Sequence, residues 1–430
     1  MTNNAGDLGV KMNRNIRWLS FGAGIRLLGI AIISPFISLF LRNTLHLAYT
    51  EIGLLLVLVN VVPLAVYPFG GMIADRLGRR RIFLISLGIE AIAMFFVALS
   101  MKYLWLPGII MGGAIDGLAG GALAGPAISA YTADFTKGSQ RTKAYTWVRI
   151  GFNVGYTVGV ALGGSLIGFI GFPEVGFLSA AIMGTATLSL FLLLDPSPYD
   201  LARAHSGSAP VSVQENNPEK LSSPGSMGNS FRILIRDKLF LLFCFAMLLA
   251  GLTEAQWGTT LPLFVNTILD VPYAILGIAL SLNGLIVIFG QTATTRLMLG
   301  RKHTTAAIYG AILYIAAFLG LGLLGLHQVD VFVLVCALVV LLTFGENMSA
   351  IPSMTLPSNL APGSELGAYN GAFLMMWGIG TSVAPVLGGL ALGATSNTLV
   401  MWLLLIIPAI PAILLFLWLG SRLNKEANRV

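Results

Sequence analysis

Long runs of hydrophobic residues, separated by short polar connections, recur along the whole of this 430-residue chain. Each run has about 20 residues or more, the length that a helix needs to cross a bilayer. Because a bilayer core offers no water to the backbone, each run is expected to form its own hydrogen bonds as a helix. The predicted spans are 17–41, 51–74, 82–101, 106–133, 144–171, 174–194, 238–268, 273–298, 304–326, 329–354, 366–392 and 397–420.

The longest polar stretch, residues 195–237, separates the sixth span from the seventh and contains SGSAPVSVQENNPEKLSSPGS. A segment so rich in Ser, Pro and Asn is typical of a flexible linker. The pattern therefore predicts an all-α membrane protein of twelve transmembrane helices in two six-helix bundles. The expected parts are an N-terminus (1–16), a first bundle (17–194), the linker (195–237), a second bundle (238–420) and a tail (421–430).

Composition supports a membrane protein. Hydrophobic residues make up 56% of the chain and charged residues 10%, whereas soluble domains carry about 25% charged residues. The 50 glycines suit close packing between membrane helices. The first apolar run is longer than the core of a signal peptide, so it is interpreted as a retained span of a multi-pass protein of the cell membrane.

The net charge of +7 is distributed unevenly. All but four of the 25 lysines and arginines fall at the termini, in the linker or in connections on one side of the predicted membrane. Only Arg42 and Lys102 lie on the other side, while Arg26 and Arg149 fall within spans. Because Lys and Arg concentrate in cytoplasmic loops, both termini and the linker are expected in the cytoplasm. This distribution argues against nucleic acid as a partner.

The two halves of the chain resemble each other. Leu39–Gly53 aligns with Leu263–Gly277 at an offset of 224 residues, with five of fifteen positions identical. Gly155–Gly164 aligns with Gly380–Gly389 at an offset of 225 residues, with five of ten identical. Six spans separate the copies, so both have the same orientation, as in transporters built from parallel repeats.

The connection between the second and third spans carries a distinctive pattern of glycines and charges: Gly71, Asp75, Arg76, Gly78, Arg79 and Arg80. With the twelve spans, the linker and the repeat, this pattern resembles the signature of the major facilitator superfamily. The resemblance implies two helical bundles around a central cavity and transport by alternating access. It also implies a gate: Asp75 would face the start of span 11, and Arg79 would bridge it to Asp134, as a latch between bundles that holds the outward-open state.

Two further patterns resemble those of exporters in that family. The glycines of Gly155–Gly164 are similar to the antiporter motif of drug–proton exporters, with Val160 where that motif has Pro. The segment Gly345–Pro352, GENMSAIP, resembles a Gly-Glu segment of some multidrug exporters and points to Glu346. The arginine that such exporters carry in span 4 is absent, since Gly113 lies near its place.

Ionisable residues within membrane spans are costly and are therefore functional candidates. A low-dielectric surrounding favours the protonated form of a carboxylic acid, a property that proton coupling requires. Glu346 is the first candidate for the proton-coupling residue, followed by Asp116 and Glu254. The alternative for each is a structural carboxylate tied to Arg26 or to a polar neighbour such as Asn347.

Aromatic and polar residues within the spans are candidates for a substrate cavity that takes lipophilic or cationic compounds, with core packing as the alternative. They are Arg26, Arg149, Asn153, Gln256, Trp257, Asn283, Asn347 and Trp377. Arg26 is expected to bind an anionic substrate or to hold an acid, and Arg149 to bind substrate or to form a gate contact.

The sequence offers no zinc spacing or histidine cluster, no phosphate-binding loop and no nucleophile–base pair, so no metal, cofactor or enzymatic activity is expected. The predicted function is proton-coupled export of hydrophobic or amphipathic small molecules by a monomer in the lipid bilayer. Uptake of a small anionic metabolite is the alternative within the same fold, and a non-transporting receptor is a third possibility.

Overall fold

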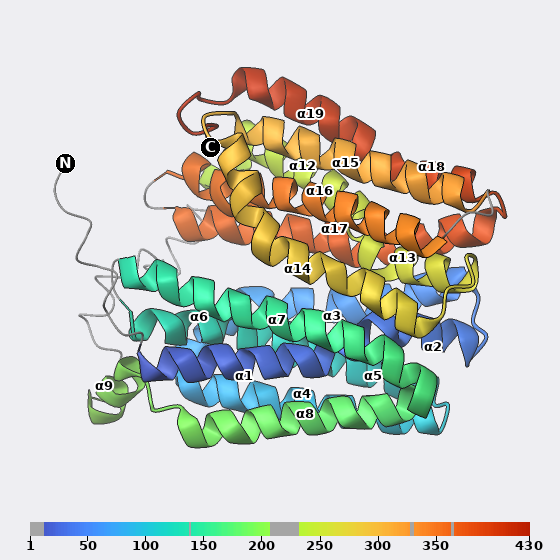
Figure 1. Cartoon of the computed structure of the whole chain (residues 1–430). Coiled ribbons are helices and arrows are strands. Elements are labelled where there is room, and N and C mark those ends of the chain that lie inside the picture. The colour runs from blue at the N-terminus through green and yellow to red at the C-terminus, as the bar shows by residue number, and fades with distance from the viewer. Residues whose placement is uncertain (1–12, 137–138, 207–231, 327–330, 363–364) are drawn as a thin grey trace.

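Among the residues that the structure describes, twelve helical segments are long and apolar enough to cross a membrane, which confirms the predicted number and order of spans. The computed structural model describes residues 13–136, 139–206, 232–326, 331–362 and 365–430 (Figure 1). The first six spans are α1 (Arg14–Ala31) with η1 (Ser34–Phe36) and α2 (Ile37–Asn43), α3 (Tyr49–Leu77), α4 (Arg79–Lys102), α5 (Leu106–Gly117) with η2 (Leu118–Ala124) and α6 (Gly125–Asp134), α7 (Ser139–Ile170), and α8 (Phe172–Leu193). The other six are α12 (Lys238–Glu254) with α13 (Gln256–Thr267), α14 (Tyr273–Met298), α15 (His303–Leu324), α16 (Val331–Leu360), α17 (Leu366–Ala394), and α18 (Thr398–Ile406) with α19 (Ala409–Arg422).

Several helices pass the predicted bounds by up to three residues, and two extend further. Helix α7 begins at Ser139 rather than at 144, and α16 continues to Leu360 rather than ending at 354. Hydropathy marks where the chain leaves the apolar region, whereas a helix ends where its backbone hydrogen bonds end. Polar turns outside the apolar region therefore lengthen both helices, and α16 even continues past Pro357.

The stretch from 195 to 237, expected to be a flexible linker, contains a defined helix, α9 (Pro198–Ser206). The hydroxyl of Ser197 accepts a hydrogen bond from the backbone N–H of Asp200 at 3.1 Å, which caps the first turn. Pro198 occupies the first helical position, where its missing N–H costs nothing. Expecting flexibility here was wrong for α9, while residues 207–231 lie outside the described part of the chain.

Helices of the first half group together, as do those of the second, and the groups meet along two helix pairs (Figure 1). Helix α7 packs against α14, and α3 packs against α17. Glycines permit the close approach: a side chain at Gly164 would collide with the carbonyl oxygen of Tyr273, and one at Gly53 with that of Pro385. The halves are therefore joined by backbone-to-backbone contact.

The glycine pattern of α7 serves packing within the first half. A side chain at Gly155, Gly159 or Gly163 would collide with carbonyl oxygens of α1. Membrane helices use small residues in this way to bring their backbones together. The same pattern had suggested an antiporter motif, and its structural effect is a tight α1–α7 pair.

The two ends of the molecule differ in charge. One end, here called the basic face, carries the start of α1, the arginines Arg79–Arg81 and helix α9 (Figure 1). The other end, here called the far face, carries the connections 44–48 and 268–272.

Candidate functional site

Arg26 and Glu90 form a buried ion pair inside the first half. Arg26 Nε donates to Glu90 Oε2 at 2.6 Å, and Arg26 Nη2 donates to Glu90 Oε1. The residues are 8% and 1% exposed. Arg26 was a candidate for binding an anionic substrate, and the structure instead places it against an acid from α4, the alternative that the sequence had left open.

Asp116 lies beside this pair. It interacts electrostatically with both Glu90 and Arg26, and its Oδ1 atom is buried without a hydrogen-bond partner among the described residues. The next turn is the π-helical segment η2, in which Gly120 faces the ion pair. A side chain at Gly120 would collide with Glu90 Oε1, so the local helix geometry and the glycine both make room for these charges.

A second polar cluster occupies the second half, where Glu346 of α16 meets Asn283 of α14. Asn283 Nδ2 donates to Glu346 Oε2 at 2.6 Å and to the hydroxyl of Thr343 at 3.2 Å. Asn283 was predicted to line the substrate cavity, and in the structure its amide is engaged in positioning the first-choice coupling acid. The two helices are therefore joined through this carboxylate.

Glu254, at the end of α12, lies close to Glu346. The two carboxylates interact electrostatically, and the side chain of Ser349 interacts with Glu254. Tyr314 of α15 is 2% exposed and within electrostatic reach of both acids. Two of the three proton-coupling candidates, Glu346 and Glu254, are thus brought together, while Asp116 belongs to the other half.

Arg149 reaches from the first half toward this cluster. Its Nη2 donates to Gln291 Oε1 of α14 at 2.6 Å, and its Nη1 contacts the sulfur of Met354 in α16 at 3.6 Å. Arg149 also interacts electrostatically with Glu346. Arg149 thus contacts the other half, and both of its predicted roles, in a gate or in substrate binding, stay predictions.

The remaining cavity candidates have different surroundings. Trp257 of α13 packs edge-on against Tyr156 of α7, with ring centroids 6.4 Å apart, so this aromatic pair spans the halves. Gln256 is fully buried and bonded to Ala384 O and to Thr260, which makes it a packing residue between α13 and α17.

Three further candidates lie within helix contacts. The amide of Asn153 donates to Arg149 O of its own helix, and that of Asn347 donates to Ile286 O of α14. Trp377 stacks with Phe373 inside the second half. The side-chain amides of both asparagines therefore donate to backbone carbonyl oxygens.

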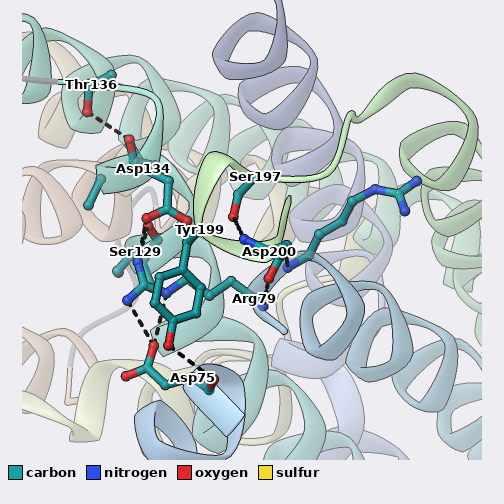
Figure 2. Close-up of polar contacts among 12 residues, drawn as sticks. Asp75, Arg79, Ser129, Asp134, Thr136, Ser197, Tyr199 and Asp200 are labelled. Carbon is teal, nitrogen blue, oxygen red and sulfur yellow. Dashed lines mark hydrogen bonds and ion pairs between the residues drawn. The ribbon is translucent and has the colours of Figure 1, made fainter. Parts of the chain in front are cut away.

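The charged pattern at the basic face forms a compact triad (Figure 2). Arg79 Nε donates to Asp75 Oδ1 at 2.9 Å, and Arg79 Nη1 donates to Asp134 Oδ1 at 2.5 Å. Gly78 permits the sharp turn between α3 and α4, since its φ of +100° disfavours any side chain. Arg79 is 5% exposed, and Asp75 and Asp134 come from α3 and α6, so these contacts lie within the first half.

The other members of the pattern lie around this triad. Gly71 falls within α3, and Arg76 is exposed at its end. The side chain of Arg80 donates to Leu194 O at 2.9 Å and to Phe191 O at 2.8 Å, so it ties the start of α4 to the end of α8.

Helix α9 closes over the triad, which the sequence had not suggested. The ring of Tyr199 covers the Arg79 guanidinium at 4.1 Å, and its hydroxyl donates to Asp75 O at 3.3 Å. Asp200 accepts from the backbone N–H groups of Arg79 at 2.8 Å and Arg80 at 3.1 Å. An acid at a helix N-terminus is favourable, so Asp200 caps α4 from outside the helix.

At the far face, three hydrogen bonds among the described residues join the halves: one from Asn43 Nδ2 to Asn266 Oδ1 at 2.8 Å, and two in pairs that the repeat relates. Asn43 Nδ2 donates to the hydroxyl of Tyr273 at 2.7 Å, and the hydroxyls of Tyr49 and Thr267 are 2.9 Å apart. The repeat offset of 224 places Asn43 on Thr267 and Tyr49 on Tyr273. Each pair is therefore the repeat equivalent of the other, with the halves exchanged. These residues also line a pocket of about 1030 Å³.

Sequence reasoning missed several residues of these sites. In the sequence Tyr156 and Tyr314 resemble ordinary core residues, and Gln291 lies near the end of a predicted span, so none of the three was named as a candidate. A signal did exist for α9, because Ser197-x-x-Asp200 has the spacing of a capping motif at a helix start.

Residues 19–335 match the family model described as Major Facilitator Superfamily. The class D tetracycline resistance protein of Salmonella ordonez is 31% identical over 54% of this chain and 54% of its own. The Na(+), Li(+), K(+)/H(+) antiporter of Planococcus maritimus is 26% identical over 78% of this chain and 80% of its own. The quinolone resistance protein NorA of Staphylococcus aureus is 26% identical over 43% of this chain.

The match spans about half the length of the two resistance proteins, 54% and 46%. Among solved structures, the nucleoside transporter NupG has a TM-score of 0.76 at 16% identity, covering 95% of this chain and 100% of that one. A POT family transporter has a TM-score of 0.67 at 15% identity, covering 94% of each chain. These structural matches establish a shared fold.

Proposed function

The chain belongs to the major facilitator superfamily, and from this premise we propose that it exports hydrophobic or amphipathic small molecules from the cell in exchange for protons. The observation that carries the proposal is the pair of neighbouring acids, Glu254 and Glu346, inside the second half. Arg149 faces this pair from the first half. When a carboxyl group of this pair gains or loses a proton beside the boundary between the halves, the attraction between the halves changes.

Two carboxylates close together in a low-dielectric surrounding disfavour double ionisation, so one of them holds a proton readily. Proton uptake from one side and release to the other then changes the charge opposite Arg149. With Glu346 ionised, the attraction to Arg149 holds α7 near α16; with Glu346 protonated, that attraction is lost. This alternation supplies the coupling that an exchanger requires.

Hydrophobic substrates are favoured by aromatic surface at the boundary between the halves. Tyr156 and Trp257 meet there from α7 and α13. Two of the relatives are named for resistance to tetracycline and to quinolones, and both names support export of such compounds. Uptake of an anionic metabolite is less well supported, because Arg26 is already neutralised by Glu90.

Exchange of an alkali cation for protons is a second candidate. The antiporter of Planococcus maritimus, named for Na(+), Li(+) and K(+), matches a larger share of this chain than either resistance protein. The acid pair serves this function as well as export, since either acid can carry a cation or a proton.

The test uses purified protein in proteoliposomes with an imposed pH gradient and tetraphenylphosphonium as the lipophilic probe. Wild type should move the probe against its gradient with counterflow of protons, and Glu346→Gln should abolish this coupling. Glu174→Gln, at an exposed acid in the first turn of α8, is the matched control and should transport normally. Coupled transport that is unchanged in Glu346→Gln excludes this acid as the coupling residue.

The triad at the basic face is proposed as the gate of this transporter. The ion pairs of Arg79 with Asp75 and Asp134 lie within the first half and are formed while the far face is closed, so they would position Asp75 rather than bridge the halves. The outward-open state would then be held by Asp75 meeting the start of α17 when the basic face closes. Asp75→Asn should therefore slow transport in a protein that folds normally. Transport at the wild-type rate in this variant would remove Asp75 from the gate.

A further inference from the structure

We propose that Glu254, Glu346, Ser349 and Tyr314 form an oxygen-lined site for a monovalent metal cation, with Na⁺ as the reference ion. The inference rests on the role proposed above for the two acids as the coupling site, and it adds an occupant. The four side chains come from α12, α15 and α16, so a bound ion would tie three helices of the second half together.

Two buried oxygen atoms in this cluster lack a hydrogen-bond partner in the described part of the chain. One is Glu254 Oε2 and the other is the hydroxyl of Tyr314. A buried polar atom without a partner is costly, and an unseen ion or water is an ordinary explanation for one. Tyr314 is 2% exposed, and its ring packs so closely against Gly345 that a side chain there would crowd it. Its hydroxyl is therefore shielded from bulk water in this structure.

The cluster also lacks a balancing positive charge of its own. The ion pairs found among the described residues involve Asp75, Glu90, Asp134 and Asp195, and neither Glu254 nor Glu346. Arg149 approaches from the other half, but its hydrogen bonds go to Gln291 and Met354. Buried carboxylates require a partner charge or neutralisation, so Glu254 needs either a proton or a cation.

The oxygen atoms of these four side chains determine which class of ion the site would bind. Carboxylate and hydroxyl oxygens suit hard cations rather than those that prefer nitrogen or sulfur. The described chain offers no group of three His, Cys, Asp or Glu side chains that would hold a transition metal. Glu346 accepts a hydrogen bond from Asn283 and is attracted by Arg149, so its negative charge is partly compensated. The two acids together therefore leave about one negative charge for an ion to balance. That balance matches a monovalent ion.

Binding of the cation should compete with protons. The titratable and charged groups that face the site are Glu254, Tyr314 and Glu346 from the second half, with Arg149 and Tyr156 from α7. Protonation of either acid removes negative charge and a free lone pair from the site. Affinity for the cation should therefore fall as the pH falls.

The experiment measures binding without any transported drug. Purified protein in nanodiscs is equilibrated with ²²Na⁺ at alkaline pH, with choline replacing Na⁺ at constant ionic strength, and its thermal unfolding is followed in parallel. Wild type should bind a single ion saturably and unfold at a higher temperature in Na⁺ than in choline. Glu254→Gln should lose both effects.

Tyr314→Phe is the sharper variant, because it removes only the hydroxyl. It should weaken Na⁺ binding by about 10-fold to 100-fold, the range typical of a lost supporting ligand. Tyr309→Phe, at an exposed tyrosine of the same helix, should bind as wild type does. No saturable ²²Na⁺ binding by wild type, or equal binding by Glu254→Gln, overturns the site. Either result leaves proton-coupled export intact, since that is measured with the lipophilic probe in sodium-free buffer.

Discussion

The ring of Tyr199 lies over the guanidinium of Arg79 at 4.1 Å, so a residue beyond the sixth span covers the central charge of the triad. Its neighbour Asp200 accepts the backbone N–H groups at the start of α4. Helix α9 and the triad therefore form one unit at the basic face. A displacement of α9 would therefore change the surroundings of Arg79.

Replacing Asp200 with Ala should destabilise the protein by about 1 kcal/mol, the usual cost of losing a helix cap. The loss should appear as a lower temperature of thermal unfolding in detergent. Glu426→Ala, at an exposed acid outside any helix, serves as the control and should leave the unfolding temperature within error of wild type. Equal unfolding temperatures for Asp200→Ala and wild type would show that the cap contributes nothing.

Replacing Glu90 with Gln should destabilise the protein more strongly, by about 3–5 kcal/mol, because it removes the carboxylate that is hydrogen-bonded to the buried Arg26 charge and leaves only the nearby Asp116. The double variant with Arg26→Gln should recover much of this loss, since neither side chain is then charged. The unfolding temperatures of the two single variants and the double variant provide the comparison. A double variant no more stable than Glu90→Gln would argue against an unpaired charge as the cause.

Replacing Gly120 with Ala should cost about 1–3 kcal/mol through overpacking, because the added methyl group would overlap Glu90 Oε1. Gly125→Ala is the matched control, because the nearest atom to its added carbon is Gly120 O at 3.9 Å. Both glycines lie at or next to the π-helical segment, so helix propensity affects them similarly. If the two variants lost equal stability, the ion pair would not be the reason for the glycine.

Loss of the far-face hydrogen bonds should shift the protein toward states open at that face. Each bond contributes about 0.5–1.5 kcal/mol, so a variant combining Asn43→Ala with Tyr49→Phe should open measurably more often. Spin labels at the exposed positions Thr44 and Ile268, in a background lacking the native cysteines, report the separation of the halves.

The double variant should populate longer label-to-label distances than its parent. Tyr103→Phe, at an exposed tyrosine after α4, should leave the distance distribution unchanged. If the double variant had the same distribution as the control, the three hydrogen bonds made by Asn43 and Tyr49 would have no part in closing this face.

The spans could be predicted because hydropathy acts locally: twenty apolar residues cross a bilayer whatever their neighbours are. The residues that contact the charged side chains within these spans could not be predicted. Whether Arg26 faces Glu90 or a cavity depends on how α1 is rotated about its axis, and that rotation is set by glycine contacts with α7. The sequence therefore showed which charged residues lie within the spans, but not which residue each of them contacts.

The residues of the acid cluster illustrate the same limit. Glu346 and Glu254 stood out because charge is rare in a span, whereas Tyr314 did not, because a tyrosine in an apolar run resembles core packing. Its hydroxyl matters only because α15 and α16 place it near two carboxylates. Helix α9 was missed for the opposite reason, since its polar composition resembles the linker around it.

The exchanged pairs of the far face also bear on how such a chain arose. A contact in which position i meets position j, and j meets i, is isologous, the arrangement of a two-fold symmetric homodimer. A chain of half this length, carrying only one amide or hydroxyl and one tyrosine at these positions, would close the same face by pairing with a second copy of itself. If such a half-length chain were duplicated and fused, only the connecting segment would have to be added for the two tyrosine contacts of this face to be kept.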